Sequence, residues 1–215
     1  MKKDLLIFDL DGTLIDSGDD IATAANMTLA AMGHEARSIE AIKENIGWGV
    51  RMLLEGLMPG EGDDRILEAR KKFLSFYGEH LTDETYIYPG VVETLSYFRE
   101  SGKTMAVVTN KPEGLSRRIL DELSLKDFFM MLIGGDTLEN RKPHPEPLEK
   151  VMAVSGFSPP ETAFVGDSPV DSETGTKAGV FTIGVSYGFR DVKELESAGF
   201  GIIIDRFSEL RALLG

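Results

Sequence analysis

FDLDGTLIDS, at residues 8–17, places two carboxylates, Asp9 and Asp11, directly after the apolar run LLIF at residues 5–8. A short run that is apolar on both faces is typical of a central strand in a parallel sheet. The Gly-Thr pair that follows Asp11 predicts a turn where this strand ends. Two like charges this close repel each other, so we expect a cation or a shared proton beside them. The stretch therefore predicts a charged site at the carboxyl end of a buried strand.

Further apolar runs predict the other strands of such a sheet. They are MAVV at 105–108, MMLI at 130–133, AFV at 163–165, FTIGV at 181–185 and GIII at 201–204. Between them lie segments whose apolar residues recur with helical spacing, as Val91, Leu95 and Phe98 do. Alternating strands and helices predict an α/β fold with a Rossmann-like, three-layer core around a central parallel sheet.

One long segment, from about Ser17 to Tyr86, interrupts this alternation because it contains no clear strand. It holds four stretches with helical spacing, at residues 21–32, 39–46, 50–57 and 66–77. We therefore predict two domains. Residues 1–16 and 87–215 form the α/β core domain, and residues 17–86 form a small helical domain inserted after the first strand.

The composition excludes several classes of function. Lys and Arg number 23 against 36 Asp and Glu, which gives a net charge of −13. Such an acidic surface repels phosphate backbones and anionic lipids, so we expect no nucleic-acid partner and no membrane partner. The chain has no cysteine, which excludes disulfides, thiolate catalysis and Cys-ligated zinc. We expect a soluble, cytoplasmic protein.

Polar and charged residues follow each of the main apolar runs, and parallel strands bring such ends to one edge of the sheet. These residues are Asp9 and Asp11 after the first run, Thr109 and Asn110 after the second, Lys142 beyond the third, and Asp167 and Asp171 after the fourth. Mg²⁺ prefers one or two carboxylates together with substrate phosphate. A carboxylate can also attack phosphorus while a second one acts as acid and then as base. This set of residue types therefore suits phosphoryl transfer.

Four motifs, FDLDGTLIDS, VVTNKP, RKPHPEP and GDSPVD, resemble in this order the four motifs of the haloacid dehalogenase-like superfamily. The helical segment after the first motif is similar to the C1-type cap of that superfamily, so the resemblance covers essentially the whole chain. Within the superfamily, TNK and GDSxxD look most like the phosphoglycolate phosphatase-like phosphatases. The resemblance implies a hydrolase with a small helical cap domain and with Mg²⁺ as its cofactor.

The resemblance also implies roles for individual residues. Asp9 is implied as the nucleophile that forms an aspartyl-phosphate, and also as a metal ligand. Asp11 is implied as the general acid and base, with its main-chain carbonyl on Mg²⁺. Thr109 and Asn110 would bind the transferring phosphate, and Lys142 would hold phosphate and nucleophile together.

The remaining candidates belong to the metal site and the substrate site. Asp167 is implied as the second carboxylate ligand, and Asp171 as a ligand or a support acting through water. Thr13 would help to position Asp11 beside the substrate. In the cap, Arg51 follows the glycine-bearing stretch IGWGV and is a candidate for binding a substrate carboxylate or second phosphate. Taken singly, all of these also have structural explanations as turn residues, helix caps or surface charges.

The activity implied by the resemblance is Mg²⁺-dependent hydrolysis of a small phosphorylated metabolite through an aspartyl-phosphate, with 2-phosphoglycolate as first choice. Alternatives on the same fold are a sugar phosphomutase similar to β-phosphoglucomutase, and a pyrophosphatase. A phosphonate hydrolase would need a cap lysine, for which Lys43 is the candidate, and a dehalogenase would have no use for Asp11. A non-catalytic binding protein is the alternative from a different class. We expect a monomer or a homodimer.

Overall fold

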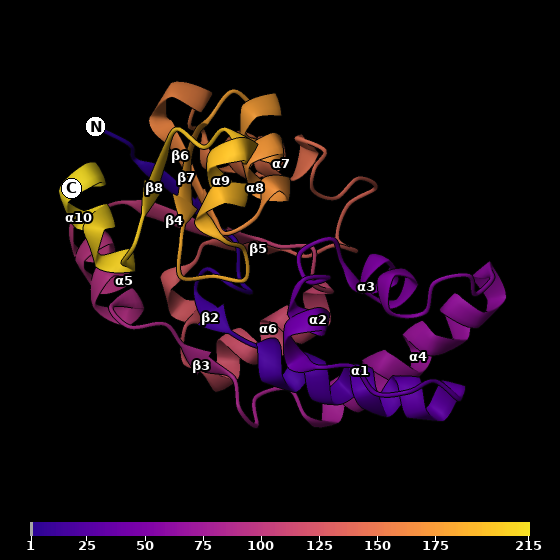
Figure 1. The fold of residues 1–215 in the computed structure, drawn as a ribbon. Coiled ribbons are helices and arrows are strands. Elements are labelled where there is room, and N and C mark those ends of the chain that lie inside the picture. Colours follow the sequence, from indigo (N-terminus) through magenta and orange to yellow (C-terminus); the bar gives the residue numbers. More distant parts are fainter. Residues whose placement is uncertain (1) are drawn as a thin grey trace.

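The computed structural model describes residues 2–215, which are built around a parallel sheet (Figure 1). Its strands are β1 (Leu5–Phe8), β4 (Thr104–Val108), β5 (Met131–Ile133), β6 (Thr162–Gly166), β7 (Phe181–Val185) and β8 (Ile202–Ile204). Their order is β5-β4-β1-β6-β7-β8, and each neighbouring pair is parallel. Every strand end lies within one residue of the apolar run that predicted it. The predicted α/β fold with a central parallel sheet is therefore confirmed.

Strand β1 lies inside the sheet and explains why LLIF is apolar throughout. It is paired with β4 on one side and β6 on the other. Successive side chains of a strand point to opposite faces, and here Leu6 and Phe8 enter one apolar cluster while Leu5 and Ile7 enter another. All four are fully buried, so each apolar residue of the run has a place in one of two cores.

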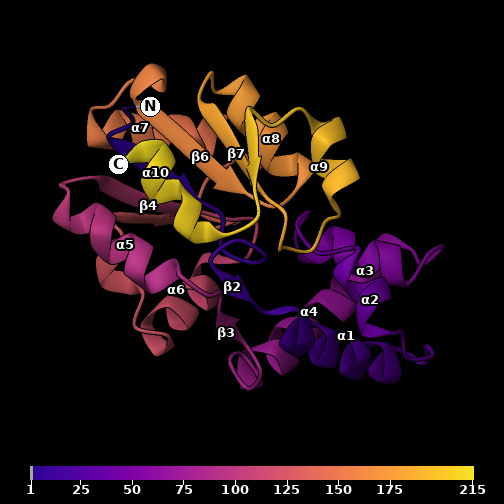
Figure 2. The same cartoon turned by 60° about the vertical axis from the view of Figure 1, so that its left-hand side comes forward.

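Helices cover both faces of the sheet (Figures 1 and 2). The core helices are α5 (Val91–Glu100), α6 (Glu113–Glu122), α7 (Glu146–Ser155), α8 (Pro169–Lys177), α9 (Val192–Ala198) and α10 (Leu210–Leu214). Helices α5, α6 and α10 share the cluster that holds Leu6 and Phe8, whereas α7 packs on the face of Leu5 and Ile7. Short 3-10 helices lie at Lys126–Phe128, Pro159–Glu161 and Phe207–Glu209. The result is the expected three-layer core.

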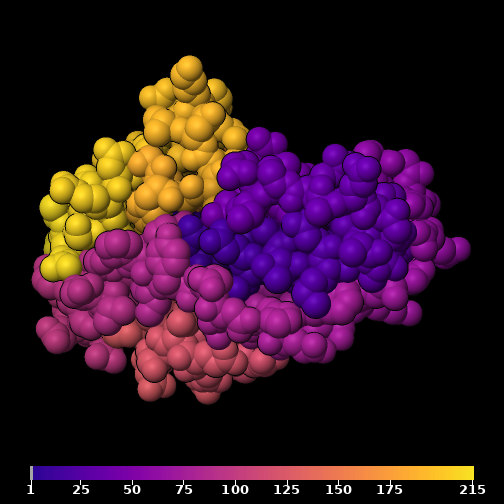
Figure 3. Space-filling model, turned by 60° about the horizontal axis from the view of Figure 1, so that its bottom comes forward, coloured from indigo at the N-terminus to yellow at the C-terminus, as the bar shows by residue number. Residues whose placement is uncertain are grey.

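The helical insert consists of α1 (Gly18–Met32), α2 (Ile39–Lys43), α3 (Val50–Leu57) and α4 (Asp63–Glu79). Helices α1 and α4 lie side by side, and the insert forms a lobe beside the sheet (Figures 1 and 3). The predicted insertion of helices after the first strand is confirmed. One buried apolar cluster continues from the insert into the core, and the exact domain boundaries stay a prediction. Within residues 2–215, no helix is both long and apolar enough to span a bilayer.

A two-stranded antiparallel ribbon joins the insert to the core, and the sequence did not predict it. It pairs β2 (Ile15–Asp16) with β3 (Tyr86–Ile87), so both connections to the insert run side by side. Two residues per strand are too few to show a period-2 pattern, which is why the segment shows no strand signal.

Asp20, in the first turn of α1, fastens the start of the insert to its end. Its side chain is buried and accepts hydrogen bonds from the backbone N–H groups of Glu84 (3.0 Å) and Thr85 (2.8 Å). The Thr85 hydroxyl donates to the same carboxylate at 2.6 Å. These contacts keep the two connections to the insert in register.

Replacing this carboxylate should destabilise the protein. We expect Asp20→Ala to lower the free energy of unfolding by roughly 3 kcal/mol, because it leaves buried N–H donors without an acceptor. Urea denaturation measures the change. Asp19→Ala is the matched control, since Asp19 lies in the same helical turn but is largely exposed and, within residues 2–215, forms its ion pair with Lys43 alone. Equal losses in the two variants would contradict the anchoring role of Asp20.

Candidate active site

The predicted site residues converge at the carboxyl edge of the sheet. Asp9 follows β1, Thr109 follows β4 and Asp167 follows β6, while Lys142 lies in the loop between β5 and α7. All four side chains are almost fully buried. The parallel order of the strands therefore brings together residues as far apart in the chain as Asp9 and Asp167.

Lys142 is the cation beside the first carboxylate. Its Nζ lies 2.9 Å from Asp9 Oδ1 and 2.6 Å from Asp171 Oδ1. Burial opposes the charged amine, but the two carboxylates outweigh this effect and raise the pKa of Lys142 above its ordinary value. Lys142 is therefore positively charged and draws Asp9 and Asp171 together.

Asp171 has two structural tasks. While Oδ1 faces Lys142, Oδ2 accepts hydrogen bonds from the backbone N–H (3.1 Å) and hydroxyl (2.6 Å) of Ser168, which caps α8. Gly166 makes room for this side chain, since a Cβ there would lie 2.3 Å from Asp171 Cγ. From the sequence, Asp171 could be either an acid in the first turn of a helix or part of a charged site. In the structure it is both.

Asp167 is held by the loop after β7. Its Oδ2 accepts a hydrogen bond of 2.8 Å from the backbone N–H of Phe189. Two glycines allow the backbone to come this close, because a Cβ on Gly12 or Gly188 would lie 2.1 Å or 2.4 Å from atoms of Asp167. Gly12 also has a φ of +79°, which disfavours any side chain there. The turn after Asp11 is thus fitted to the Asp167 carboxylate.

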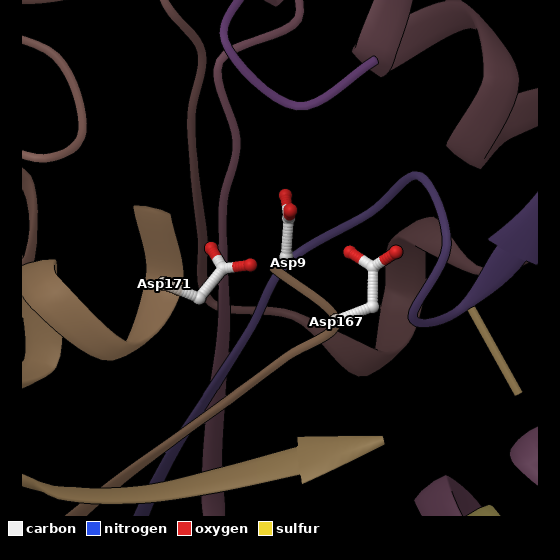
Figure 4. Close-up of side chains that lie close together, drawn as sticks. All are labelled: Asp9, Asp167 and Asp171. Carbon is white, nitrogen blue, oxygen red and sulfur yellow. The ribbon is translucent and has the colours of Figure 1, made fainter. Parts of the chain in front are cut away.

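The carboxylates of Asp9, Asp167 and Asp171 project into one space (Figure 4), with one oxygen of each within 4.8 Å of the others. Burial raises the pKa of Asp9 to about 7, with Lys142 opposing the shift and Asp171 adding to it. Burial, with repulsion from Asp171 and Asp9, also raises the pKa of Asp167 well above its ordinary range. One lysine does not balance three buried acids. Hard oxygen donors with uncompensated charge fit a divalent cation such as Mg²⁺.

Asp11 has a cation of its own, and the sequence analysis did not select it. Lys111 Nζ lies 2.6 Å from Asp11 Oδ1, and the Ser17 hydroxyl donates to the same oxygen at 2.5 Å. Lys111 is buried; its burial opposes the charge, but Asp11 outweighs this and the pKa of Lys111 is raised. Its position three residues after β4, in the motif VVTNKP, could have identified Lys111 as a site residue. Asp9 and Asp11 thus have separate lysine partners.

Three further predicted residues lie near this pair. Thr109 Oγ1 accepts the backbone N–H of Lys111 at 3.2 Å. Asn110 Nδ2 donates to the carbonyls of Gly47 and Lys142, both at 3.0 Å. Thr13 is fully buried and is not among the residues that line the cavity described next; its carbonyl accepts the Tyr187 hydroxyl at 2.9 Å.

A cavity between the core and the insert exposes the site. The core contributes Asp9, Asp11, Thr109, Asn110, Lys111 and Pro112, and the insert contributes Ile21, Asn45, Ile46, Gly47, Gly49, Val50, Leu53, Phe73 and Tyr77. The core wall is therefore charged and polar, whereas the insert wall is mostly apolar.

Two cap residues named from the sequence do not line this cavity. The Arg51 guanidinium is half-exposed and pairs with Glu55 (2.6 Å) and Asp63 (2.5 Å) on the insert. Lys43 Nζ lies 3.7 Å from Asp16 and 3.3 Å from Asp19. Both cations are occupied by acids of the insert or its connection to the core.

Arg190, which the sequence analysis did not select, joins the core to the insert. Its guanidinium donates to the carbonyls of Lys43 (3.1 Å) and Ile46 (2.6 Å) while its Nε faces Glu194. The side chain is buried, and its acceptors on the insert are backbone atoms, so no motif could have indicated this contact. Together with the bond from Asn110 to Gly47, it holds the insert over the cavity.

Comparisons with known proteins agree with this arrangement. Residues 6–185 match the model of the family described as haloacid dehalogenase-like hydrolase. A phosphoglycolate phosphatase of Pseudomonas putida is 38% identical over 98% of this chain and 78% of its own length. One from Salmonella paratyphi A is 34% identical over 97% of this chain and 91% of its own. A crystal structure described as a predicted phosphoglycolate phosphatase from Haemophilus somnus superimposes with a TM-score of 0.94 at 29% identity, covering 99% of this chain and 98% of that one.

Stability should depend jointly on pH and on divalent metal. The pKa of Asp9 is about 7 in the folded chain, against 3.8 ordinarily, so ionising it costs stability as pH rises from about 4 to about 7. A bound cation favours the ionised form. We therefore expect MgCl₂ to raise Tm, and to raise it more near pH 8 than near pH 5.

Thermal denaturation with MgCl₂ or with a chelator measures this effect. Asp167→Asn should lose most of the metal-induced rise in Tm, because it removes one of the clustered carboxylates. Asp127→Asn, on an exposed 3-10 helix, is the matched control and should respond as the unaltered protein does. A rise in Tm that is equal at both pH values, or unaffected by Asp167→Asn, would place the cation elsewhere.

Proposed function

The chain belongs to the haloacid dehalogenase-like hydrolase family, and we propose that it is a Mg²⁺-dependent phosphatase of small phosphorylated metabolites. Its first-choice substrate is 2-phosphoglycolate. Residues 17–86 act as a cap domain over a core of residues 1–16 and 87–215.

One observation carries the proposal. Two neighbouring carboxylates, Asp9 and Asp11, open on the same cavity, and each has its own buried lysine. Such an arrangement gives the two acids different environments, as a nucleophile and a proton carrier require. The similar proteins from Pseudomonas and Salmonella are phosphoglycolate phosphatases, which supports phosphoglycolate as the substrate.

In the proposed first step, Asp9 attacks phosphorus and forms the aspartyl-phosphate while the bond to the leaving oxygen breaks. Asp11, once protonated, donates its proton to that oxygen, and Lys111 and Ser17 orient its carboxyl group. Lys142, Thr109 and Asn110 bind the phosphate oxygens. A Mg²⁺ ion held by Asp9, Asp167 and the Asp11 carbonyl, with Asp171 as ligand or support, would neutralise phosphate charge.

In the second step, Asp11 takes a proton from water as the water oxygen attacks the same phosphorus. The bond from phosphorus to the Asp9 oxygen breaks, which releases inorganic phosphate and restores both carboxyl groups. The apolar insert wall excludes bulk water while the ester is bound. The contacts from Arg190 and Asn110 to insert carbonyls hold the wall in place during this cycle.

Replacing the proposed nucleophile tests the chemistry. We expect Asp9→Asn to reduce kcat by at least about 10³-fold, since an amide cannot form the acyl phosphate. The fold should survive, because burial already disfavours the charged form of Asp9. Phosphate release and Tm measure the two effects. A fully active Asp9→Asn protein, purified free of other phosphatases, would refute the mechanism.

A substrate panel distinguishes the proposed phosphatase from its alternatives. We expect Mg²⁺-dependent phosphate release, with the highest kcat/KM for 2-phosphoglycolate among small esters, hexose phosphates and pyrophosphate. The insert wall offers no lysine or arginine to a second phosphate, which disfavours pyrophosphate. Isomerisation of a hexose phosphate without net phosphate release would instead indicate a mutase. Absence of Mg²⁺-dependent turnover across the panel would favour a binding protein.

A further inference from the structure

The insert wall of the cavity contains a buried donor that no described residue satisfies. Within residues 2–215, three buried side-chain atoms lack a hydrogen-bond partner: Thr13 Oγ1, Asn110 Oδ1 and the Tyr77 hydroxyl. Thr13 lies outside the cavity, and Asn110 Oδ1 is an acceptor. Of the three, only the Tyr77 hydroxyl is therefore a donor on a residue that lines the cavity. Tyr77 is only 1% exposed.

Tyr77 lies in the cavity wall, where it could contact a bound substrate. It comes from α4, follows Phe73 by one helical turn and lines the cavity with it. Lys111 Nζ lies over its ring, 4.6 Å from the centroid, pairs with Asp11 and also interacts with the Tyr77 hydroxyl oxygen. An ammonium group only donates, so it gives the hydroxyl proton no acceptor. Burial raises the pKa of Tyr77 to about 12, so the hydroxyl keeps its proton at neutral pH. A buried hydroxyl whose proton has no acceptor is costly, which points to a missing acceptor in the cavity.

The start of α3 lines the same cavity and favours negative charge. Gly49 precedes the helix, no side chain caps it and its first turn has no acidic residue. Both Gly49 and Val50 line the cavity. The first N–H groups of a helix lack internal partners and carry partial positive charge. Such a terminus binds carboxylate or phosphate oxygens.

We propose that the Tyr77 hydroxyl and the amino end of α3 bind a carboxylate on the leaving group of the substrate. This inference rests on the proposed phosphatase function and makes these groups responsible for a preference for acidic over neutral phosphate esters. A carboxylate fits better than a second phosphate, because Lys111 is paired with Asp11 and Arg51 lies outside the cavity. A sugar would need several polar partners, and the neighbouring insert residues are mostly apolar.

Tyr77→Phe removes the hydroxyl and leaves the ring. We expect the ratio of kcat/KM for 2-phosphoglycolate to that for ethyl phosphate to fall about tenfold, or about 1.4 kcal/mol, because only the acidic ester supplies an acceptor. Tm should stay equal or rise, since an unpartnered buried hydroxyl is lost. Tyr97→Phe, on the exposed side of α5, is the matched control and should leave the ratio unchanged.

A second pair of variants tests the helix terminus. Val50→Pro removes one N–H at the first helical position, where proline is well tolerated, and Val50→Ala changes only the side chain. We expect the ratio of kcat/KM for 2-phosphoglycolate to that for ethyl phosphate to be lower in the proline variant than in the alanine variant. Binding of 2-phosphoglycolate to Asp9→Asn, measured by calorimetry with and without Tyr77→Phe, should weaken about tenfold.

The outcomes separate this inference from the proposed function. If the unaltered protein hydrolyses neither ester, the phosphatase function fails and the inference fails with it. If it hydrolyses both, but Tyr77→Phe lowers both kcat/KM values equally or lowers neither, the function stands and the inference is overturned. A large fall in Tm would likewise show that the hydroxyl serves the fold.

Discussion

The organisation of this protein depends on the imbalance of buried charge at the end of β1. Lys142 faces both Asp9 and Asp171, and Asp167 adds a third carboxylate to the same space. Desolvating so many like charges costs stability, and an ion pair of this kind rarely repays it. The cluster is thus better explained by chemistry than by folding. A divalent cation would offset this excess negative charge, and together with Lys142 it would attract the negative oxygens of a phosphate group, as phosphoryl transfer requires.

The insert completes this site with few polar contacts. Arg190 and Asn110 donate to carbonyls of the loop between α2 and α3, and Asp20 fixes the two connections at the far end. Backbone carbonyls accept these bonds whatever side chains the loop carries. The wall can therefore vary in sequence while its position is kept. The apolar cluster shared with the core supplies the remaining adhesion.

The fold was readable from sequence because its central strands β1 and β6 are buried on both faces, so LLIF and AFV are apolar throughout and show no competing pattern. The site motifs were readable because strand ends meet at one edge, which fixes Asp9 and Lys142 as neighbours. Other features carry no local signal. The β2–β3 ribbon is too short to show a period. Arg190 contacts the insert only through backbone carbonyls, and Arg51 pairs with Glu55 and Asp63, which lie outside its own motif.

The same reasoning explains why the leaving-group end of the site is hidden. Phosphate recognition needs charged residues, which stand out in any sequence. An apolar wall with one donor needs only apolar and aromatic residues at helical spacing, which any core helix also has. Phe73 and Tyr77 therefore have the spacing of ordinary core residues on α4. What distinguishes Tyr77 is a three-dimensional property: the residue lines the cavity, and its buried hydroxyl proton has no acceptor within residues 2–215. Specificity can thus change through one oxygen atom while every motif stays the same.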